Sequence, residues 1–254
     1  MEIYIYIMLF IFGSVIGSFL NVLAMRLSNN ESILWPRSHC HNCQHKLRWY
    51  ELIPVISYVI QKGKSRCCRT NIPISYLIIE VVTGILYMVS YHSFGFGYEF
   101  IISLIFISAL ITIIVSDIEY MIILDEIIAV SCILIIILEL IFFGLNYTVD
   151  KILGGILAFI TMYVIKLIGD KLFKRESMGG GDIKLMFLFG IVIGYPLSIC
   201  DIFLATFIAF PVAIYLLFSR KDNLIPFGPF LAMGAILIHI SKVDINSIIN
   251  FLIR

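Results

Sequence analysis

Residues 100–117 read FIISLIFISALITIIVSD, an unbroken apolar run that ends on the carboxylate of Asp117. A helix of about 20 apolar residues is long enough to cross the hydrocarbon core of a bilayer. An ionisable group at the edge of such a helix is expensive in lipid and is therefore a candidate functional residue. The stretch predicts a membrane-spanning helix with a functional carboxylate at one end.

The composition of the whole chain agrees with a membrane protein. Of its 254 residues, 61% are hydrophobic and 14% are charged, whereas soluble domains have roughly 45–50% and about 25%. Because this small number of charged residues cannot cover the surface of a water-soluble fold, we expect membrane lipid to surround most of the chain. The net charge of +1 argues against a nucleic-acid partner.

Apolar runs of about 17–20 residues recur along the chain and predict an all-α polytopic membrane protein with about eight transmembrane helices. The first run follows Glu2, without a basic residue or a small-residue cleavage site, which favours a true span over a cleaved signal peptide. The last three runs are crowded, so one of them is a candidate re-entrant segment. The predicted spans are 3–25, 76–92, 100–116, 127–143, 151–168, 184–200, 202–218 and 227–241.

Basic residues alternate between the connections, which predicts the orientation of the spans. Lys and Arg gather in residues 26–69, 166–175 and 220–221, whereas the connections near 92–99, 144–150 and 200–201 hold only Lys151, at one edge. Because basic connections face the cytosol, we expect the N-terminus outside and, with eight spans, the C-terminus outside as well.

Two units follow from this arrangement. Residues 1–92 are predicted to form a helical hairpin around a cytosolic insert, residues 26–75, and residues 98–254 a bundle of the remaining spans. In the first span, Gly13 and Gly17 stand four residues apart, a spacing that predicts close helix packing, more plausibly within the chain than between chains. Glu80 lies inside the second span and is expected to pair with an arginine near the cytosolic side.

The insert carries Cys40 and Cys43 in a Cys-x-x-Cys pair, followed by Cys67 and Cys68. The cytosol is reducing, so a disulfide is not expected there. Two cysteine pairs can complete a tetrahedral zinc site that stabilises an insert too short to build a core. Adjacent cysteines rarely ligate one ion together, so free thiols and other ligands stay open as alternatives: His39, His41 and His45.

Three aspartates fall at the predicted cytosolic membrane face. Asp117 ends the third span, Asp125 precedes the fourth, and Asp182 follows Gly179–Gly181. Two carboxylates held close together share a proton, so one can activate water while the other polarises a scissile carbonyl. Glycines before Asp182 would allow close approach of a substrate strand. For Asp125 we favour helix capping or simple solvation.

Six segments in order resemble the bacterial type IV prepilin peptidases, a leader peptidase and N-methyltransferase family of GxGD-type aspartyl proteases. The resemblance covers nearly the whole chain, which makes it specific although each motif alone is weak. The segments are 17–22 with Arg26, 36–43, 49–58, 117–125, 180–185 and 226–232.

The resemblance implies roles for individual residues. It makes Asp117 and Asp182 the catalytic pair, and it makes Cys40, Cys43 and Cys68 zinc ligands. Ser65 stands where the family usually has a cysteine, so Cys67 is the expected fourth ligand; Leu124 replaces a usual proline. The residues expected to support the catalytic pair are Gly179, Gly180, Gly181, Asp125 and Lys184.

The resemblance also implies an activity and a location. It points to an intramembrane endopeptidase of the bacterial inner membrane, with its active site toward the cytosol, that removes the leader from precursors with a hydrophobic N-terminal helix. Pilins, secretion pseudopilins and competence pseudopilins all fit as substrates. Methylation of the new N-terminus from S-adenosylmethionine is implied too, although no glycine-rich cofactor fingerprint supports it.

Three other classes of protein stay open from the sequence. A transporter would also carry polar residues in a multi-span bundle, although the charges here gather at one face rather than at the midplane. A non-enzymatic assembly protein could hold a partner through a zinc knuckle, but it leaves Gly179–Gly181 before Asp182 unexplained. The third class is the GxGD proteases with other substrates, and the cysteine insert argues against it.

Overall fold

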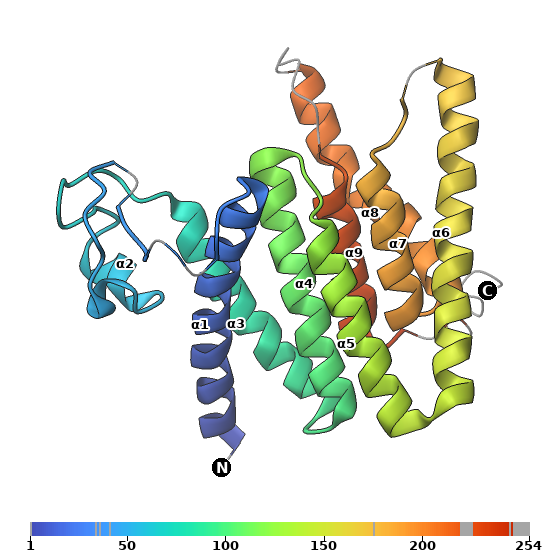
Figure 1. Ribbon diagram of the computed structural model, residues 1–254, viewed down its shortest axis with the longest axis horizontal. Helices are drawn as coiled ribbons and strands as arrows, with labels where there is room; N and C mark the ends of the chain where they lie inside the picture. The colour runs from blue at the N-terminus through green and yellow to red at the C-terminus, as the bar shows by residue number, and fades with distance from the viewer. Residues whose placement is uncertain are drawn as a thin grey trace. The chain divides into compact units, whose positions relative to one another are not determined.

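A computed structural model describes residues 2–33, 35, 37–40, 42–174, 176–218, 226–243 and 245 of the chain (Figure 1). Within these residues the regular elements are helices, so the predicted all-α class is confirmed. The chain divides into two compact units, Met1–His92 and Ser93–Arg254. Several residues used above lie outside the described part: Pro36, His41, Arg175, Arg220, Lys221 and the C-terminal residues 246–254.

The first unit is built on α1 (Glu2–Ser28) and α3 (Ile74–Phe94), whose last two residues belong to the second unit. The helices approach closely, because a Cβ added to Gly13 would lie 2.8 Å from the Cα of Gly84. A Cβ added to Gly17 would lie 2.8 Å from the Oγ1 of Thr83. The small residues of α1 therefore pack against a helix of the same chain, as predicted.

Between these helices, the described residues of the insert contain η1 (Trp49–Glu51) and α2 (Ile56–Ile60) as their regular elements. Glu80 of α3 accepts a hydrogen bond of 2.7 Å from the backbone N–H of Val55, which has a φ of 61°. The prediction that Glu80 pairs with an arginine is therefore wrong. A backbone amide left free by a turn satisfies the carboxylate instead and fastens the insert to α3.

The second unit holds six helices within its described residues: α4 (Tyr98–Tyr120), α5 (Asp125–Phe143), α6 (Leu145–Phe173), α7 (Gly180–Val192), α8 (Tyr195–Phe218) and α9 (Gly228–Ser241). The central element is α7, which packs against α5, α6, α8 and α9. This helix contributes Leu188 and Phe189 to the core, and both are fully buried. The ring of Phe189 packs edge to face against Phe106 of α4. Aromatic pairs of this kind add to the stability that burial supplies.

Glycines allow the closest contact in this unit. A Cβ added to Gly190 of α7 would lie 2.6 Å from the carbonyl oxygen of Gly154 and from the Cα of Gly155 in α6. The two backbones therefore touch without intervening side chains, a mode of packing typical of membrane helices.

In the part of the chain that the structure describes, six helices are long and apolar enough to cross a membrane: α1, α3, α4, α5, α6 and α8. The predicted number of eight spans is not confirmed, because α7 has 13 residues and α9 has 14. Helices of this length rise about 20 Å, less than the roughly 30 Å of a hydrocarbon core.

The predicted span 184–200 is not one helix. The helix α7 ends at Val192 and α8 begins at Tyr195. Gly194 separates them with a φ of +83°, a conformation that glycine adopts without strain, and Pro196 lies in the first turn of α8. The apolar run continues through this break, which is why hydropathy alone joined the two segments.

The order of the helices brings three distant segments to one end of the second unit. The α4–α5 connection, the start of α7 and the start of α9 meet there, toward the top of Figure 1. The α5–α6 turn and the α7–α8 turn lie at the opposite end.

Candidate active site and cysteine cluster

Asp117 lies in the last turn of α4 and is 6% exposed. The helix ends at Tyr120. Its C-cap, Met121, has a left-handed conformation that turns the chain toward α5, and the Met121 N–H bonds to the Asp117 carbonyl. The backbone N–H of Gly228, at the start of α9, lies close to the Asp117 carboxylate and favours its negative charge. A Cβ on Gly228 would lie 2.5 Å from the Oδ2 of Asp117, so a larger residue there would displace this carboxylate.

Asp182 lies in the first turn of α7 and is also 6% exposed. The backbone N–H of Gly179, the residue that precedes the helix, lies close to the Asp182 carboxylate and favours its negative charge. This arrangement resembles one half of a capping box, in which the third helical residue reaches back to the N-cap amide. A Cβ on Gly179 would lie 3.3 Å from the Oδ2 of Asp182, so this position is tight as well.

The two carboxylates lie near enough to interact electrostatically. Ile123, from the α4–α5 connection, packs between the starts of α7 and α9: a Cβ on Gly181 would lie 2.6 Å from its Cβ, and one on Gly228 would lie 3.1 Å from its Cδ1. The structure therefore brings together the segments 117–125, 179–185 and 226–232. Sequence reasoning quoted the last of these as a motif but did not anticipate that its glycine contacts Asp117.

Each carboxylate meets the N-terminal end of a helix, where free N–H groups favour negative charge. Two buried carboxylates that interact with each other cannot both be ionised easily, a condition that favours a pair sharing one proton. A pair in this state offers a general base and a general acid at once. The catalytic role of the two aspartates stays a prediction, but the geometry suits it.

The predicted supporting residues Asp125 and Lys184 form an ion pair of 2.6 Å between the first turn of α5 and the second turn of α7. Their side chains are 60% and 50% exposed, so the pair contributes at most about 1 kcal/mol. Asp125 is the first residue of α5 and Leu124 is its N-cap, so Asp125 does not cap the helix, whereas its exposed side chain agrees with the expected solvation.

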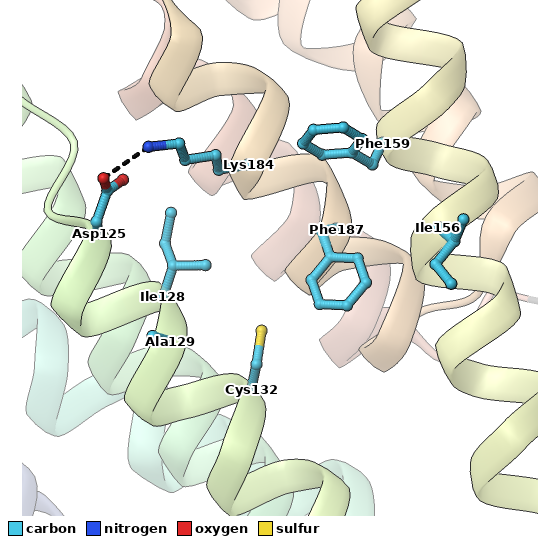
Figure 2. Close-up of a pocket in the computed structure, with 8 residues that line it drawn as sticks. All are labelled: Asp125, Ile128, Ala129, Cys132, Ile156, Phe159, Lys184 and Phe187. Carbon is cyan, nitrogen blue, oxygen red and sulfur yellow. Dashed lines mark hydrogen bonds and ion pairs between the residues drawn. The ribbon is translucent and has the colours of Figure 1, made fainter.

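A groove of about 430 Å³ begins at this ion pair and runs between α5, α6 and α7 (Figure 2). Apart from the ion pair its lining is apolar: Ile128, Ala129, Cys132, Ile156, Phe159 and Phe187. Sequence reasoning missed the groove, because its walls come from three helices whose pairing is not visible in a single sequence.

The four cysteines of the insert form one cluster, with all Sγ atoms within 4.8 Å of one another. The Sγ atoms of Cys40 and Cys68 are 3.6 Å apart, and those of Cys67 and Cys68 are 3.8 Å apart. Four thiolates around one zinc ion, each about 2.3 Å from it, have sulfur–sulfur distances of about 3.8 Å. The donor set fits a tetrahedral zinc ion, with Cys43 and Cys67 closer, at 2.9 Å.

Two turns of the same design carry these cysteines. In the first, the Cys40 N–H bonds to the His45 carbonyl, and Gln44, with a φ of 58°, returns its N–H to the Cys40 carbonyl. In the second turn, the Ser65 N–H bonds to the Thr70 carbonyl. Arg69, with a φ of 55°, donates its N–H to the Ser65 carbonyl.

Adding 25 to each residue number of the first turn gives its counterpart in the second. Ser65 thus occupies the position equivalent to Cys40, and Cys68 the position equivalent to Cys43. The ligand that the second turn lacks at Ser65 is supplied by Cys67, whose Sγ lies 2.9 Å from both the Ser65 Oγ and the Cys43 Sγ. This supports the prediction of Cys67 as the fourth ligand.

Hydrogen bonds also set the acidity of the thiols. The Thr70 hydroxyl and backbone N–H lower the pKa of Cys68 to about 5, and the Ser65 hydroxyl is the main cause that lowers the pKa of Cys40. The neighbouring sulfur of Cys67 raises the pKa of Cys43 to about 12. Since zinc binds thiolates, these hydrogen bonds favour metal binding by Cys68 and Cys40.

Comparisons with known proteins show the family of this chain. A family model described as "Bacterial Peptidase A24 N-terminal domain" matches residues 11–94, and one described as "Type IV leader peptidase family" matches residues 104–214. A Bacillus subtilis protein named prepilin leader peptidase/N-methyltransferase is 34% identical over 97% of this chain and 97% of its own length. The chain belongs to the type IV leader peptidase family.

Other relatives of this leader peptidase family member carry the same name. The Vibrio cholerae protein is 31% identical over 94% of this chain and 98% of its own length. The Myxococcus xanthus protein is 33% identical to this chain. That match covers 72% of this chain and 55% of the Myxococcus xanthus protein. No solved structure matches the chain. The matched leader peptidase region contains both Asp117 and Asp182, and the N-terminal region contains all four clustered cysteines.

Proposed function

We propose that this leader peptidase family member is an intramembrane aspartyl endopeptidase that removes the leader of type IV prepilin-like precursors at the cytosolic membrane face. The observation that carries the proposal is the meeting of Asp117 and Asp182, both buried, at the starts of α7 and α9. Membership of the family supports the substrate class, since the relatives are named for prepilin leaders.

The proposed reaction needs only water and the two carboxylates. The ionised carboxylate takes a proton from water as the water oxygen attacks the scissile carbonyl carbon. The protonated carboxyl gives its proton to the carbonyl oxygen, and the tetrahedral intermediate then collapses as the C–N bond breaks and the leaving amine is protonated. The amides of Gly228 and Gly179 each hold one carboxylate, which keeps both in position for the attacking water.

The cysteine cluster has a structural role in this proposal. Zinc held by Cys40, Cys43, Cys67 and Cys68 would join the two turns of an insert whose described residues contain little regular structure. The ion would supply folding energy and take no part in peptide hydrolysis.

Methylation of the new N-terminus belongs to the proposal as a second activity, because the relatives are named N-methyltransferases as well. In that reaction the freed amine attacks the methyl group of S-adenosylmethionine, S-adenosylhomocysteine leaves, and the amine loses a proton. We assign no residue of this chain to the second activity.

Co-expression with a tagged pilin-like precursor tests the proposal, with the intact mass of the precursor as the readout. The wild type should remove the leader, whereas Asp182→Asn should leave the precursor whole at the same level of peptidase. Asp150→Asn, an exposed carboxylate at the other end of the second unit, is the matched control and should cleave normally. A leader removed equally well by Asp182→Asn would refute the proposed mechanism, and an added methyl mass on the product would show the second activity.

A further inference from the structure

A second cavity, of about 330 Å³, lies at the end of the second unit opposite Asp117 and Asp182. The ends of α5, α7 and α9 and the starts of α4, α6 and α8 surround it. The proposed mechanism uses none of its side chains, yet several are ionisable. These are Glu99, Glu139, Lys151, His239 and Lys242.

Glu139 is the most deeply buried of these groups. It belongs to α5, is 3% exposed, and its Oε2 has no hydrogen-bond partner among the described residues. A carboxylate without donors is expensive to bury, above all in a membrane-spanning helix. Nothing in the proposed peptidase reaction explains why α5 carries it so far from the aspartates.

Lys151 of α6 faces the same cavity. Its Nζ donates one hydrogen bond of 3.2 Å to the carbonyl oxygen of Val192 at the end of α7, and it lies 5.6 Å from the centre of the Tyr147 ring. An ammonium has three donors, so the Val192 bond accounts for one of them. Lys151 interacts electrostatically with Glu139, but no ion pair within 4 Å joins these two described side chains.

The cavity therefore sets an acceptor and a donor of opposite charge on its walls without joining them. A ligand that satisfies both must itself carry a cation with N–H donors and an anionic acceptor. Water can also fill a polar space of this size, which makes a water-filled cavity the competing outcome.

The residues beside the cavity indicate where such a ligand comes from. Phe143 stacks on Tyr147 at 4.4 Å and meets Tyr98 edge to face at 4.6 Å. Lys242 pairs with Glu99 at 3.6 Å, both being about half exposed. Aromatic rings gather at membrane–water interfaces, which favours a position of the cavity near the lipid headgroups.

We propose that this cavity binds the headgroup of a lipid that carries both a primary ammonium and a phosphate, as phosphatidylethanolamine does. The ammonium donates to the Glu139 carboxylate, with the Tyr147 ring beside it. The phosphate accepts from Lys151. Phosphatidylglycerol has no ammonium for Glu139, and the quaternary amine of phosphatidylcholine has no N–H to donate, so both should bind less well.

Native mass spectrometry of the purified full-length protein tests this, after exchange into micelles with equal amounts of the three lipids. The wild type should retain phosphatidylethanolamine about tenfold over the other two, because a charge-assisted hydrogen bond is lost with each. Glu139→Gln and Lys151→Met should each remove that preference. Glu126→Gln and Lys171→Met, exposed positions near the other ends of the same two helices, should keep it.

A competition with the wild type covers the case in which the cavity variants fail to fold. Soluble phosphoethanolamine should displace the lipid only at far higher concentration, and ethanolamine or inorganic phosphate alone should not displace it. Equal retention of the three lipids, or a preference that survives both cavity variants, would mean that water fills the cavity. Displacement by phosphate alone, or phosphoethanolamine binding as tightly as the lipid, would also overturn the proposal.

Discussion

Gly228 illustrates how a residue without a side chain can determine the position of a catalytic group. Its N–H holds the Asp117 carboxylate, and the place where its Cβ would stand is 2.5 Å from the Oδ2 of Asp117. The carboxylate cannot stay where it is if this residue gains a methyl group.

Replacing this glycine should therefore damage the active site more than the fold. We expect Gly228→Ala to lower leader cleavage by about 10²-fold, the size of loss that a displacement near 1 Å causes. Gly97→Ala is the control, because nothing lies within 4 Å of a Cβ there. Cleavage assays on equal amounts of purified protein check this, and normal cleavage by Gly228→Ala would show that the contact has no bearing on catalysis.

The cysteine cluster offers a second test on single residues, because Ser65 stands where Cys40 stands in the other turn. Cys67→Ser should lose bound zinc, since only three thiolates stay. Adding Ser65→Cys to that variant should restore the zinc by returning a thiolate to the equivalent position. Elemental analysis of purified protein gives the zinc content; zinc retained by Cys67→Ser alone would remove Cys67 from the ligand set.

Among the helices, α6 and α7 are held at their shortest distance by glycine. A Cβ on Gly190 would lie 2.6 Å from backbone atoms of α6, which have no flexible end that can move aside. Gly190→Ala should force the helices apart and destabilise the protein by about 1–3 kcal/mol, as overpacking does. Thermal unfolding in detergent, with Gly97→Ala alongside, measures the difference. An unchanged unfolding temperature would mean that the two helices do not need this contact.

The same helices show what a single sequence reveals and what it conceals. Asp117, Asp182 and the cysteines were found because their residue types are unusual in their surroundings and stand in short motifs. The break at Gly194 was missed because the residues on both sides are apolar. The Gly228 contact and the cavity around Glu139 were missed for a different reason: both depend on which distant helices pair, which local patterns do not record.

For the whole molecule, the alternation of basic connections predicts which end of the second unit faces the cytosol. Cysteines introduced at Phe96 and Glu176, exposed positions at opposite ends of that unit, report the orientation. In intact spheroplasts a membrane-impermeant maleimide should label Phe96→Cys and leave Glu176→Cys unlabelled. The reverse pattern would place the aspartates outside the cell, where they could not meet a leader in the cytosol.

The peptidase proposal rests on the two aspartates acting together. The most direct measurement is the rate at which purified wild type, Asp117→Asn, Asp182→Asn and Asp150→Asn remove the leader from one precursor in the same detergent, with zinc content and helical signal compared to confirm folding. We predict that the first two variants lose at least about 10²–10⁴-fold in rate, while Asp150→Asn keeps the wild-type rate. Wild-type cleavage by either Asp117→Asn or Asp182→Asn in a folded protein would contradict the assignment of these residues as the catalytic pair.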